Sequence, residues 1–186
     1  MTRDSGPPVL YLGIGAGRLA VPLHQAGIDL VGVDSHPGML EHLRTRLPAV
    51  ELVQSRIEDL DLGRQFAMVM VPSNILCAVE RLRGAARQLA SDGRLAFELT
   101  NPHWLRAGAT DGVRVKRFDG NQASIEVDYH VPDHKLVTQV AEVPLIWPEE
   151  IENWLARGAG LRLQRMFGRR DRALTESPSF FVIASR

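Results

Sequence analysis

The sequence predicts an α/β fold: a Rossmann-like, doubly wound, mostly parallel sheet of seven strands, with an antiparallel strand insertion after strand five. Three observations predict it. Short apolar stretches alternate with helical patterns over the first half of the chain, as in successive βαβ units. A glycine-rich loop follows the first stretch and an acid follows the second, which is typical of a nucleotide site. Beyond Thr100, apolar and polar residues alternate, which indicates antiparallel strands with one exposed face.

The first element is a strand over residues 9–12, followed by a loop with glycine at every second position from 13 to 17. Glycine lets the backbone turn sharply and come close to a ligand. A helix over 17–26 is expected to point its free N–H groups at that ligand. A second strand over 28–33 then leads to Asp34, whose carboxylate can accept hydrogen bonds from ribose hydroxyls.

Helices and strands then alternate up to Leu99. Ser35 is expected to cap a helix that has Pro37 in its first turn. The run 66–71 is almost continuously apolar, as expected of a strand buried on both faces. Ser73 or Asn74 is expected to cap the following helix. The remaining strands of this half are expected over 50–54 and 94–99.

The second half predicts a meander beside the main sheet. Residues 113–118 form one short strand, and 123–131 alternate strictly between apolar and polar side chains. Pro132-Asp133-His134 makes a turn, and the chain returns over 135–145. A helix over 148–156 and strands over 161–167 and 179–185 complete the main sheet.

Composition favours a single domain with a real core and gives little reason to expect a charged partner. The 186 residues carry 22 basic and 22 acidic side chains, so neither nucleic acid nor an anionic membrane is indicated as a partner. Cys77 is the only cysteine, which is typical of a reducing cytoplasm, and its apolar surroundings favour a core residue over a nucleophile. The chain shows no leader peptide and no apolar run of about 18 residues, so secretion and a membrane span are not indicated.

The glycine spacing distinguishes between two kinds of nucleotide site. The dinucleotide fingerprint G-x-G-x-x-G would need glycine where Arg18 stands. The observed G-x-G-x-G, followed by the acid Asp34 and by Met39-Leu40, resembles the first motif of the class I S-adenosylmethionine (SAM)-dependent methyltransferases. The order of elements is similar to that of the small-molecule branch of this family over nearly the whole chain.

This resemblance implies transfer of a methyl group from SAM to a nitrogen or oxygen of a small-molecule acceptor, with S-adenosylhomocysteine (SAH) as product. Two alternatives stay open. One is a SAM-binding protein that has lost methyl transfer, and the less favoured one is an NAD-dependent oxidoreductase. The cofactor contacts that the resemblance implies are Tyr11, Gly13, Gly15, Gly17, Asp34, Met39, Ile57, Glu58, Pro72 and Ser73.

Each of these residues is expected to contact a particular part of the cofactor. The glycines pass its methionine and ribose parts, Ile57 and Glu58 flank adenine, and Pro72 with Ser73 lies near the methyl group. Met39 packs near the sugar or adenine, or else belongs to the core of its own helix.

Three residues are candidates for a catalytic base: His103, Glu98 and His130. Each has a structural alternative. His103 follows Asn101-Pro102, which can cap and open a short helix and leave the imidazole exposed. Glu98 can bind an acceptor amine or hydrogen-bond the backbone, and His130 can be solvated on its strand. No closed zinc set is formed by the histidines and acids of this region, so no metal is expected.

Departures from the family pattern bear on the site. Tyr11, Arg56 and Ala67 stand where the family often has acids, and the family usually carries helices before the first strand that cover the site. Either the site is more open, or a neighbouring subunit covers it, as in a homodimer, or catalysis has been lost. Within one domain of 1–186, the resemblance divides the chain into a SAM-binding half (1–100), an insertion that covers the acceptor (101–147) and closing elements (148–186).

Overall fold

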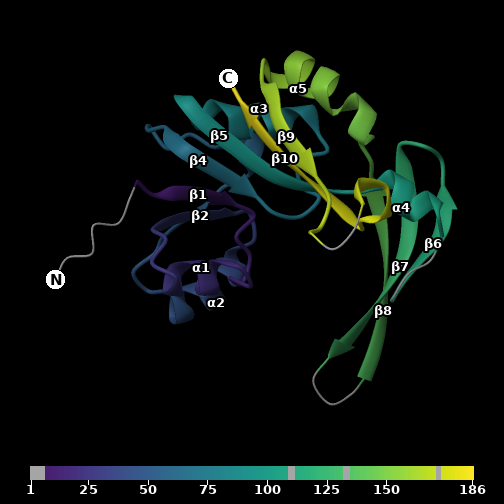
Figure 1. Ribbon diagram of the computed structural model, residues 1–186. Coiled ribbons are helices and arrows are strands. Elements are labelled where there is room, and N and C mark those ends of the chain that lie inside the picture. Colours follow the sequence, from purple (N-terminus) through teal and green to yellow (C-terminus); the bar gives the residue numbers. More distant parts are fainter. Residues whose placement is uncertain (1–6, 109–111, 132–134, 171–172) are drawn as a thin grey trace.

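The computed structural model describes residues 7–108, 112–131, 135–170 and 173–186 (Figure 1). The strands of its main sheet are β1 (Val9–Leu12), β2 (Leu30–Asp34), β3 (Glu51–Gln54), β4 (Phe66–Val71), β5 (Leu89–Thr100), β9 (Arg162–Phe167) and β10 (Ser179–Ser185). They lie in the order β3-β2-β1-β4-β5-β10-β9, and β10 runs antiparallel to both of its neighbours. The predicted fold class, a mostly parallel sheet of seven strands, is confirmed.

Helices lie on both faces of this sheet (Figure 1). They are α1 (Ala20–Gln25) and α2 (Pro37–Arg46) on one face, and α3 (Val79–Arg87) and α5 (Ile151–Ala159) on the other. Alternate residues of β1 serve the two faces, since successive side chains of a strand point to opposite sides. Leu10 and Leu12 join the apolar cluster under α3 and α5, whereas Tyr11 packs in the cluster with Leu40 and Leu43 of α2.

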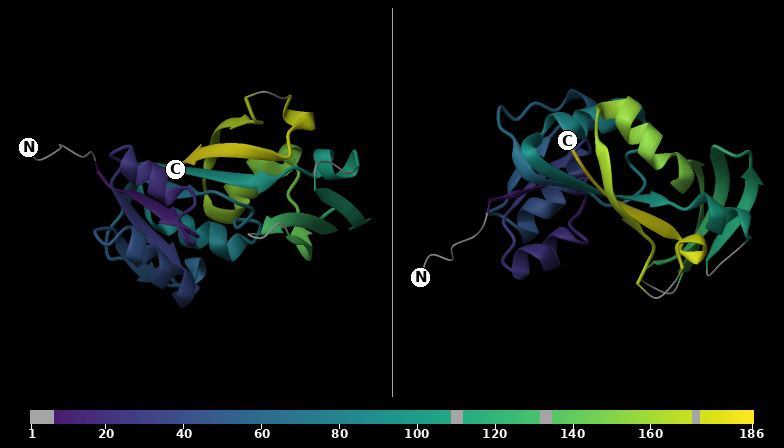
Figure 2. Two further views of the ribbon diagram at one scale, coloured as in Figure 1. Left: turned by 90° about the horizontal axis from the view of Figure 1, so that it is seen from below. Right: turned by 45° about the horizontal axis from the view of Figure 1, so that its top comes forward.

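The predicted meander forms a second sheet of its own. Its strands β6 (Val113–Phe118), β7 (Gln122–Val131) and β8 (Lys135–Pro144) pair in that order, all antiparallel. The predicted turn at 132–134 lies outside the described residues. Both views of Figure 2 place this sheet at one end of the main sheet, and the short helix α4 (Pro102–Arg106) leads into it from β5. No helix of the described chain is both long and apolar enough to cross a membrane.

The starts of α1 and α2 differ from the predicted ones. α2 is capped by His36, whose Nδ1 accepts from the Met39 N–H at 3.3 Å, and not by Ser35. The Asp34 carboxylate accepts from the His36 N–H at 2.9 Å, which moves the start of the helix one residue along the chain. α1 begins at Ala20, later than predicted, because the glycine loop continues in turns up to that point.

Neither Ser73 nor Asn74 caps α3, which begins only at Val79. The Asn74 side chain is engaged elsewhere: Oδ1 accepts from the Thr100 N–H at 2.9 Å, and Nδ2 donates to the Pro144 carbonyl at 3.0 Å. One amide therefore joins the segment after β4 to the end of β5 and to the end of β8. Partners this distant in sequence could not be inferred from local capping rules.

The prediction that β4 is buried on both faces is wrong. Its residues under α3 are fully buried, but Ala67 is exposed and Met68 and Met70 are only partly buried. The same open face continues on β10, where Ile183 is partly buried. In the described chain, α1 and α2 pack over β1, β2 and β3, and Met70 is the residue of this open face that packs against their apolar cluster.

Gly84 of α3 marks the closest approach of that helix to η1 (Ile57–Asp59), a single 3₁₀ turn. A Cβ at Gly84 would lie 2.7 Å from the Ile57 carbonyl carbon and closer still to its oxygen, and 3.1 Å from the Glu58 Cα. Gly84→Ala is therefore expected to lower the free energy of unfolding by about 1–3 kcal/mol, because backbone has to move. Thermal unfolding checks this, with exposed Gly38→Ala in α2 as the control. A Cβ at Gly38 would lie 3.2 Å from Cε1 of the exposed His36 side chain, so only a side chain has to shift and a smaller effect is expected.

Candidate functional site

A cavity of about 510 Å³ opens at the carboxyl ends of β1, β2 and β3. This is the edge at which open α/β sheets bind ligands, and the volume suits a nucleotide-sized molecule. The residues that line it are Gly13, Val33, Asp34, Ser35, Ser55, Arg56, Ile57, Glu58, Ile75 and Arg81. Four of the predicted cofactor contacts are among them: Gly13, Asp34, Ile57 and Glu58.

The glycine loop forms one wall of the cavity. Gly13 and Ile14 both donate their N–H groups to the Val33 carbonyl, at 2.8 and 3.0 Å, which fastens the loop to the end of β2. Gly13 and Gly15 have φ angles of 73° and 55°, where a side chain would be strained. A Cβ at Gly15 would meet nothing within 4 Å, so that part of the backbone faces open space.

Asp34 holds the loop and faces the cavity at the same time. Its Oδ2 accepts from the Gly15 N–H at 2.8 Å and its Oδ1 from the His36 N–H at 2.9 Å. A carboxylate offers about four lone-pair positions, so each oxygen keeps one for a ligand. The geometry suits a carboxylate that receives a pair of ligand hydroxyls while it fixes the loop on which the ligand rests.

The far wall carries charges that neutralise one another. The Glu58 carboxylate hydrogen-bonds the Arg56 guanidinium and lies 4.0 Å from Arg81 Nε. Its own backbone N–H and the Arg56 guanidinium hold the pKa of the Glu58 carboxyl below its usual range, so it is ionised at neutral pH. Arg56, which stands where the resembling family often has an acid, is thus the partner of an acid two residues away.

Several predicted contacts lie outside the lining of the cavity. Tyr11 is 4% exposed, and burial raises the pKa of its hydroxyl. Gly17 is buried against Leu43 of α2. Met39 is 44% exposed on α2, so the alternative that it belongs to the core of its helix is wrong, whereas its cofactor role stays a prediction.

Pro72 and Ser73 follow β4 at the same edge of the sheet. Ser73 has a φ of 88°, a conformation that residues other than glycine rarely adopt. Its N–H donates to Glu98 Oε2 at 3.1 Å, so the candidate base Glu98 contacts the segment that was predicted to lie near the methyl group. The strained residue and the carboxylate stand together at the carboxyl ends of β4 and β5.

His103 lies on α4, one turn beyond β5. Asn101 caps this helix as the structural alternative predicted, since its Oδ1 accepts from the His103 N–H at 3.1 Å. The imidazole Nε2 lies 2.6 Å from Glu149 Oε1, and the ring meets Trp147 edge-on with centroids 5.0 Å apart. A histidine oriented by a carboxylate is a usual arrangement for a base, and it equally suits a structural contact.

The second sheet carries His130, the third candidate base, and the histidines and acids considered for a metal site. His130 lies in β7 opposite Leu136, and its side chain is outside what the structure describes. Within the described ranges, no group of three or more His, Cys, Asp or Glu side chains is placed to hold a metal ion. Cys77 is half-buried, and burial raises the pKa of its thiol to about 11, which leaves it protonated at neutral pH.

Sequence reasoning missed half of the cavity wall. Val33 and Ser35 flank Asp34 and could have been added from their position alone. Ser55, Ile75 and Arg81 come from three separate segments, after β3, after β4 and within α3. No local pattern marks them, because only the folded sheet brings these segments to one edge.

Residues 9–93 match a family model described as a methyltransferase domain. Among curated proteins, an uncharacterized methyltransferase of Mycobacterium tuberculosis strain H37Rv is 33% identical over 92 residues, which are 48% of this chain and 38% of that protein. A ubiquinone biosynthesis O-methyltransferase of Azorhizobium caulinodans is 32% identical over 118 residues, 61% of this chain and 44% of that protein. The matched region thus spans less than half the length of these relatives.

Solved structures resemble the chain over nearly its whole length. The CcbJ methyltransferase of Streptomyces caelestis superimposes with a TM-score of 0.74 and 22% identity, covering 97% of this chain and 89% of that one. CalS10 of Micromonospora echinaspora, an amino pentose methyltransferase solved with SAM bound, gives a TM-score of 0.73 and 21% identity, covering 99% and 85%. At such identities the likeness establishes the fold.

Proposed function

Because residues 9–93 belong to the methyltransferase domain family and the described chain has the fold of SAM-dependent methyltransferases, we propose that this protein transfers a methyl group from SAM to a nitrogen or oxygen of a small molecule. SAH is the product. The proposal includes both nitrogen and oxygen as the acceptor atom, since one relative is named as an O-methyltransferase and one structural neighbour as an amino pentose methyltransferase.

One observation carries the proposal: the cavity between the glycine loop, Asp34 and Glu58. Asp34 has an oxygen lone pair for each ribose hydroxyl, and Gly15 offers backbone that no side chain shields. Ile57 lies 8% exposed at the cavity wall and supplies an apolar surface for adenine. The residues present therefore fit the adenosine part of SAM.

The chemistry asks little of the protein beyond alignment. SAM supplies a methyl group on a positively charged sulfur; the acceptor lone pair forms the new bond as the carbon–sulfur bond breaks, and the acceptor releases a proton. Holding the two partners in line can supply about 7–11 kcal/mol of the barrier reduction. The contribution of this chain is to bind the adenosine part at β1 to β3 and to present an acceptor at the ends of β4 and β5.

The acceptor is proposed to bind between these strand ends and the second sheet. α4 and the β6–β8 sheet follow β5 directly, and Figure 1 shows the long β7–β8 hairpin beyond the carboxyl ends of the main strands. The division into a cofactor half (1–100), an acceptor cover (101–147) and closing elements (148–186) is kept as part of the proposal. So are a homodimer, a cytoplasmic location and the absence of nucleic acid as a partner, all predicted from the sequence.

Titration calorimetry of the purified chain with SAM, SAH and NAD tests the function. SAM and SAH are expected to bind in the micromolar range and NAD to give no heat. Binding of NAD alone would contradict the proposal in favour of the oxidoreductase. If SAM binds but no SAH forms with any of a panel of amine and hydroxyl acceptors, the alternative of a SAM-binding protein without methyl transfer replaces it.

His103 is the base that this proposal assigns, with Glu149 orienting its imidazole. His103→Ala is expected to lower turnover on the order of 10²-fold, the lower end of the range for a general base, and to leave SAM affinity unchanged. The rate of SAH formation at saturating SAM measures it, and His42→Ala on the exposed side of α2 is the control. Full activity of His103→Ala would show that His103 takes no part in the mechanism and that its imidazole makes only a structural contact with Glu149 and Trp147.

A further inference from the structure

Tyr11 and Glu98 lie on one face of the main sheet, close to its carboxyl edge. Tyr11 of β1 is level with Met70 of β4, and Met70 is level with Ala96 of β5. Glu98 is two residues further along β5, so it points to the same face, one step nearer the edge. Its carboxylate reaches sideways to the Ser73 N–H at 3.1 Å. An acid is therefore held at this corner by the strand end next to β1.

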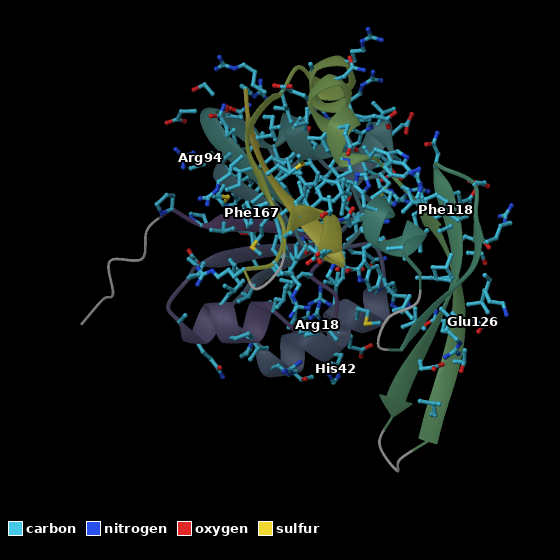
Figure 3. All side chains as sticks on the ribbon, turned by 45° about the vertical axis from the view of Figure 1, so that its right-hand side comes forward. Arg18, His42, Arg94, Phe118, Glu126 and Phe167 are labelled. Atoms are coloured by element: carbon cyan, nitrogen blue, oxygen red, sulfur yellow. The ribbon has the colours of Figure 1, made fainter. Side chains whose placement is uncertain are left out.

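Arg18 brings a positive charge to the same corner. It comes directly after the glycine loop, its side chain is exposed, and Figure 3 shows it beside the α1–α2 layer, below the strands of the main sheet. Arg18 and Glu98 both act on the Tyr11 hydroxyl: the cation favours and the anion disfavours its ionised form. Within the described part of the chain, neither Arg18 nor Glu98 has an ion-pair partner.

The corner adjoins the cavity through Gly13 and Ile75, which are among its lining residues and lie close to each other. Each follows a residue of the corner by two positions, since Gly13 follows Tyr11 and Ile75 follows Ser73. A ligand that has its adenosine part at Asp34 and Glu58 therefore has the rest of its length directed toward Tyr11. For SAM, that remainder is an amino acid, with one ammonium and one carboxylate group.

Resting on the proposed function, we propose that Glu98 binds the α-ammonium group and Arg18 the α-carboxylate group of the methionine part of SAM, on either side of Tyr11. Tyr11 of β1 stands where the resembling family often has an acid, and Glu98 would supply an acid to the same face of the sheet from β5. The two positions face the same side of the sheet one step apart, so two acids there would repel each other. A tyrosine at one and an acid at the other is the arrangement that keeps a single negative charge.

This assignment gives Glu98 a role other than that of a base. Its carboxylate accepts from the Ser73 N–H at 3.1 Å, which fixes its position, and the ammonium group would be its second donor. The donor of this hydrogen bond is Ser73, whose φ of 88° is one that residues other than glycine rarely adopt. Ser73 is thereby placed to position Glu98.

Calorimetry with two ligands separates this inference from the function on which it rests. SAH carries the amino acid part, whereas 5′-methylthioadenosine has the adenosine and sulfur without it. Glu98→Gln and Arg18→Gln are each expected to weaken SAH binding about tenfold to a hundredfold, the range for one hydrogen bond to a charged group. The affinity for 5′-methylthioadenosine is expected to stay that of the wild type. The matched controls are Glu152→Gln on α5 and Arg44→Gln on α2, both exposed.

The outcomes are distinct. If neither ligand binds the wild-type chain, the proposed function fails. If SAH binds and the Glu98 variant binds it as tightly as the wild type does, the inference is overturned. Equal weakening of both ligands also overturns it, because a clamp on the amino acid part cannot act on a ligand without one. Unchanged SAH affinity with a raised KM for an amine acceptor would instead assign Glu98 to the acceptor.

Discussion

Asp34→Ala is expected to weaken SAM binding by about 1–3 kcal/mol, about fivefold to 150-fold in Kd, because ribose hydroxyls lose their acceptor in the cavity. The Gly15 and His36 N–H groups lose their partner as well, so the glycine loop is then held by the Val33 carbonyl and by the Arg46 guanidinium, which donates to the Ala16 carbonyl at 2.8 Å. Titration calorimetry with SAM measures the change. Both losses act in the same direction on ligand affinity.

Two further variants separate the roles of Asp34. Asp29→Ala removes the same charge at the opposite, exposed end of β2 and is expected to bind SAM as the wild type does. Asp34→Asn keeps the shape, but its amide NH₂ must face one of the two N–H donors, so its affinity is expected to fall as well. Wild-type affinity in Asp34→Ala would place the ribose elsewhere than in the cavity.

Asn101→Ala is expected to cause the largest loss of stability, on the order of 3 kcal/mol or more. Asn101 is completely buried, and its Nδ2 donates to the carbonyl oxygens of Leu174 and Ser177 at 2.6 and 2.9 Å. Truncation leaves the Ser177 carbonyl without its donor and the Leu174 carbonyl with only the Ser177 N–H at 3.4 Å. It also removes the cap of α4, where Oδ1 accepts from the His103 N–H. Each of these losses acts on the junction between β5, α4 and the closing segment of the chain.

Thermal unfolding tests the prediction for Asn101. For a chain of this size about 2–4 °C is expected for each kcal/mol, so the melting temperature should fall by roughly 6–12 °C. Asn153→Ala on the exposed side of α5 makes the same chemical change and is expected to leave it unaltered. If the two variants melt together, the amide of Asn101 does not hold α4 to the η3 turn (Leu174–Glu176).

The strands could be predicted from the sequence because each is a short apolar run with clear ends. The bounds of β1, β4 and β6 match the predicted ones. β5 was predicted to begin at Arg94, after the Asp92-Gly93 turn, but Leu89 already pairs with Phe66 before the register shifts. Burial was less predictable. The apolar run of β4 is typical of a strand that is buried on both faces of the sheet, whereas Met68 and Met70 remain partly exposed.

Some residues of the candidate site could likewise be predicted from the sequence and others could not. Gly13 and Asp34 could be found because strand, loop and acid occur close together in the sequence. Arg81 and Ser55 could not, since each depends on which segments the sheet brings to its edge. Asn74 shows the limit most clearly: its side chain follows a strand as a cap residue would, yet its partners Thr100 and Pro144 lie 26 and 70 positions away.

The bond from Asn74 to Pro144 has a consequence for motion. It fixes the last residue of β8 to the main sheet, while the remainder of the β7–β8 hairpin extends away from that point (Figure 1), and Glu126 of the second sheet lies well apart from His42 on α2 (Figure 3). A hairpin anchored at its base would be displaced least beside the tip of β4 and most at its far end. Loop motions of this kind take place in nanoseconds to microseconds, faster than typical turnover. Under the proposed function, an acceptor would enter and leave beneath the hairpin without disturbing the cofactor end of the site.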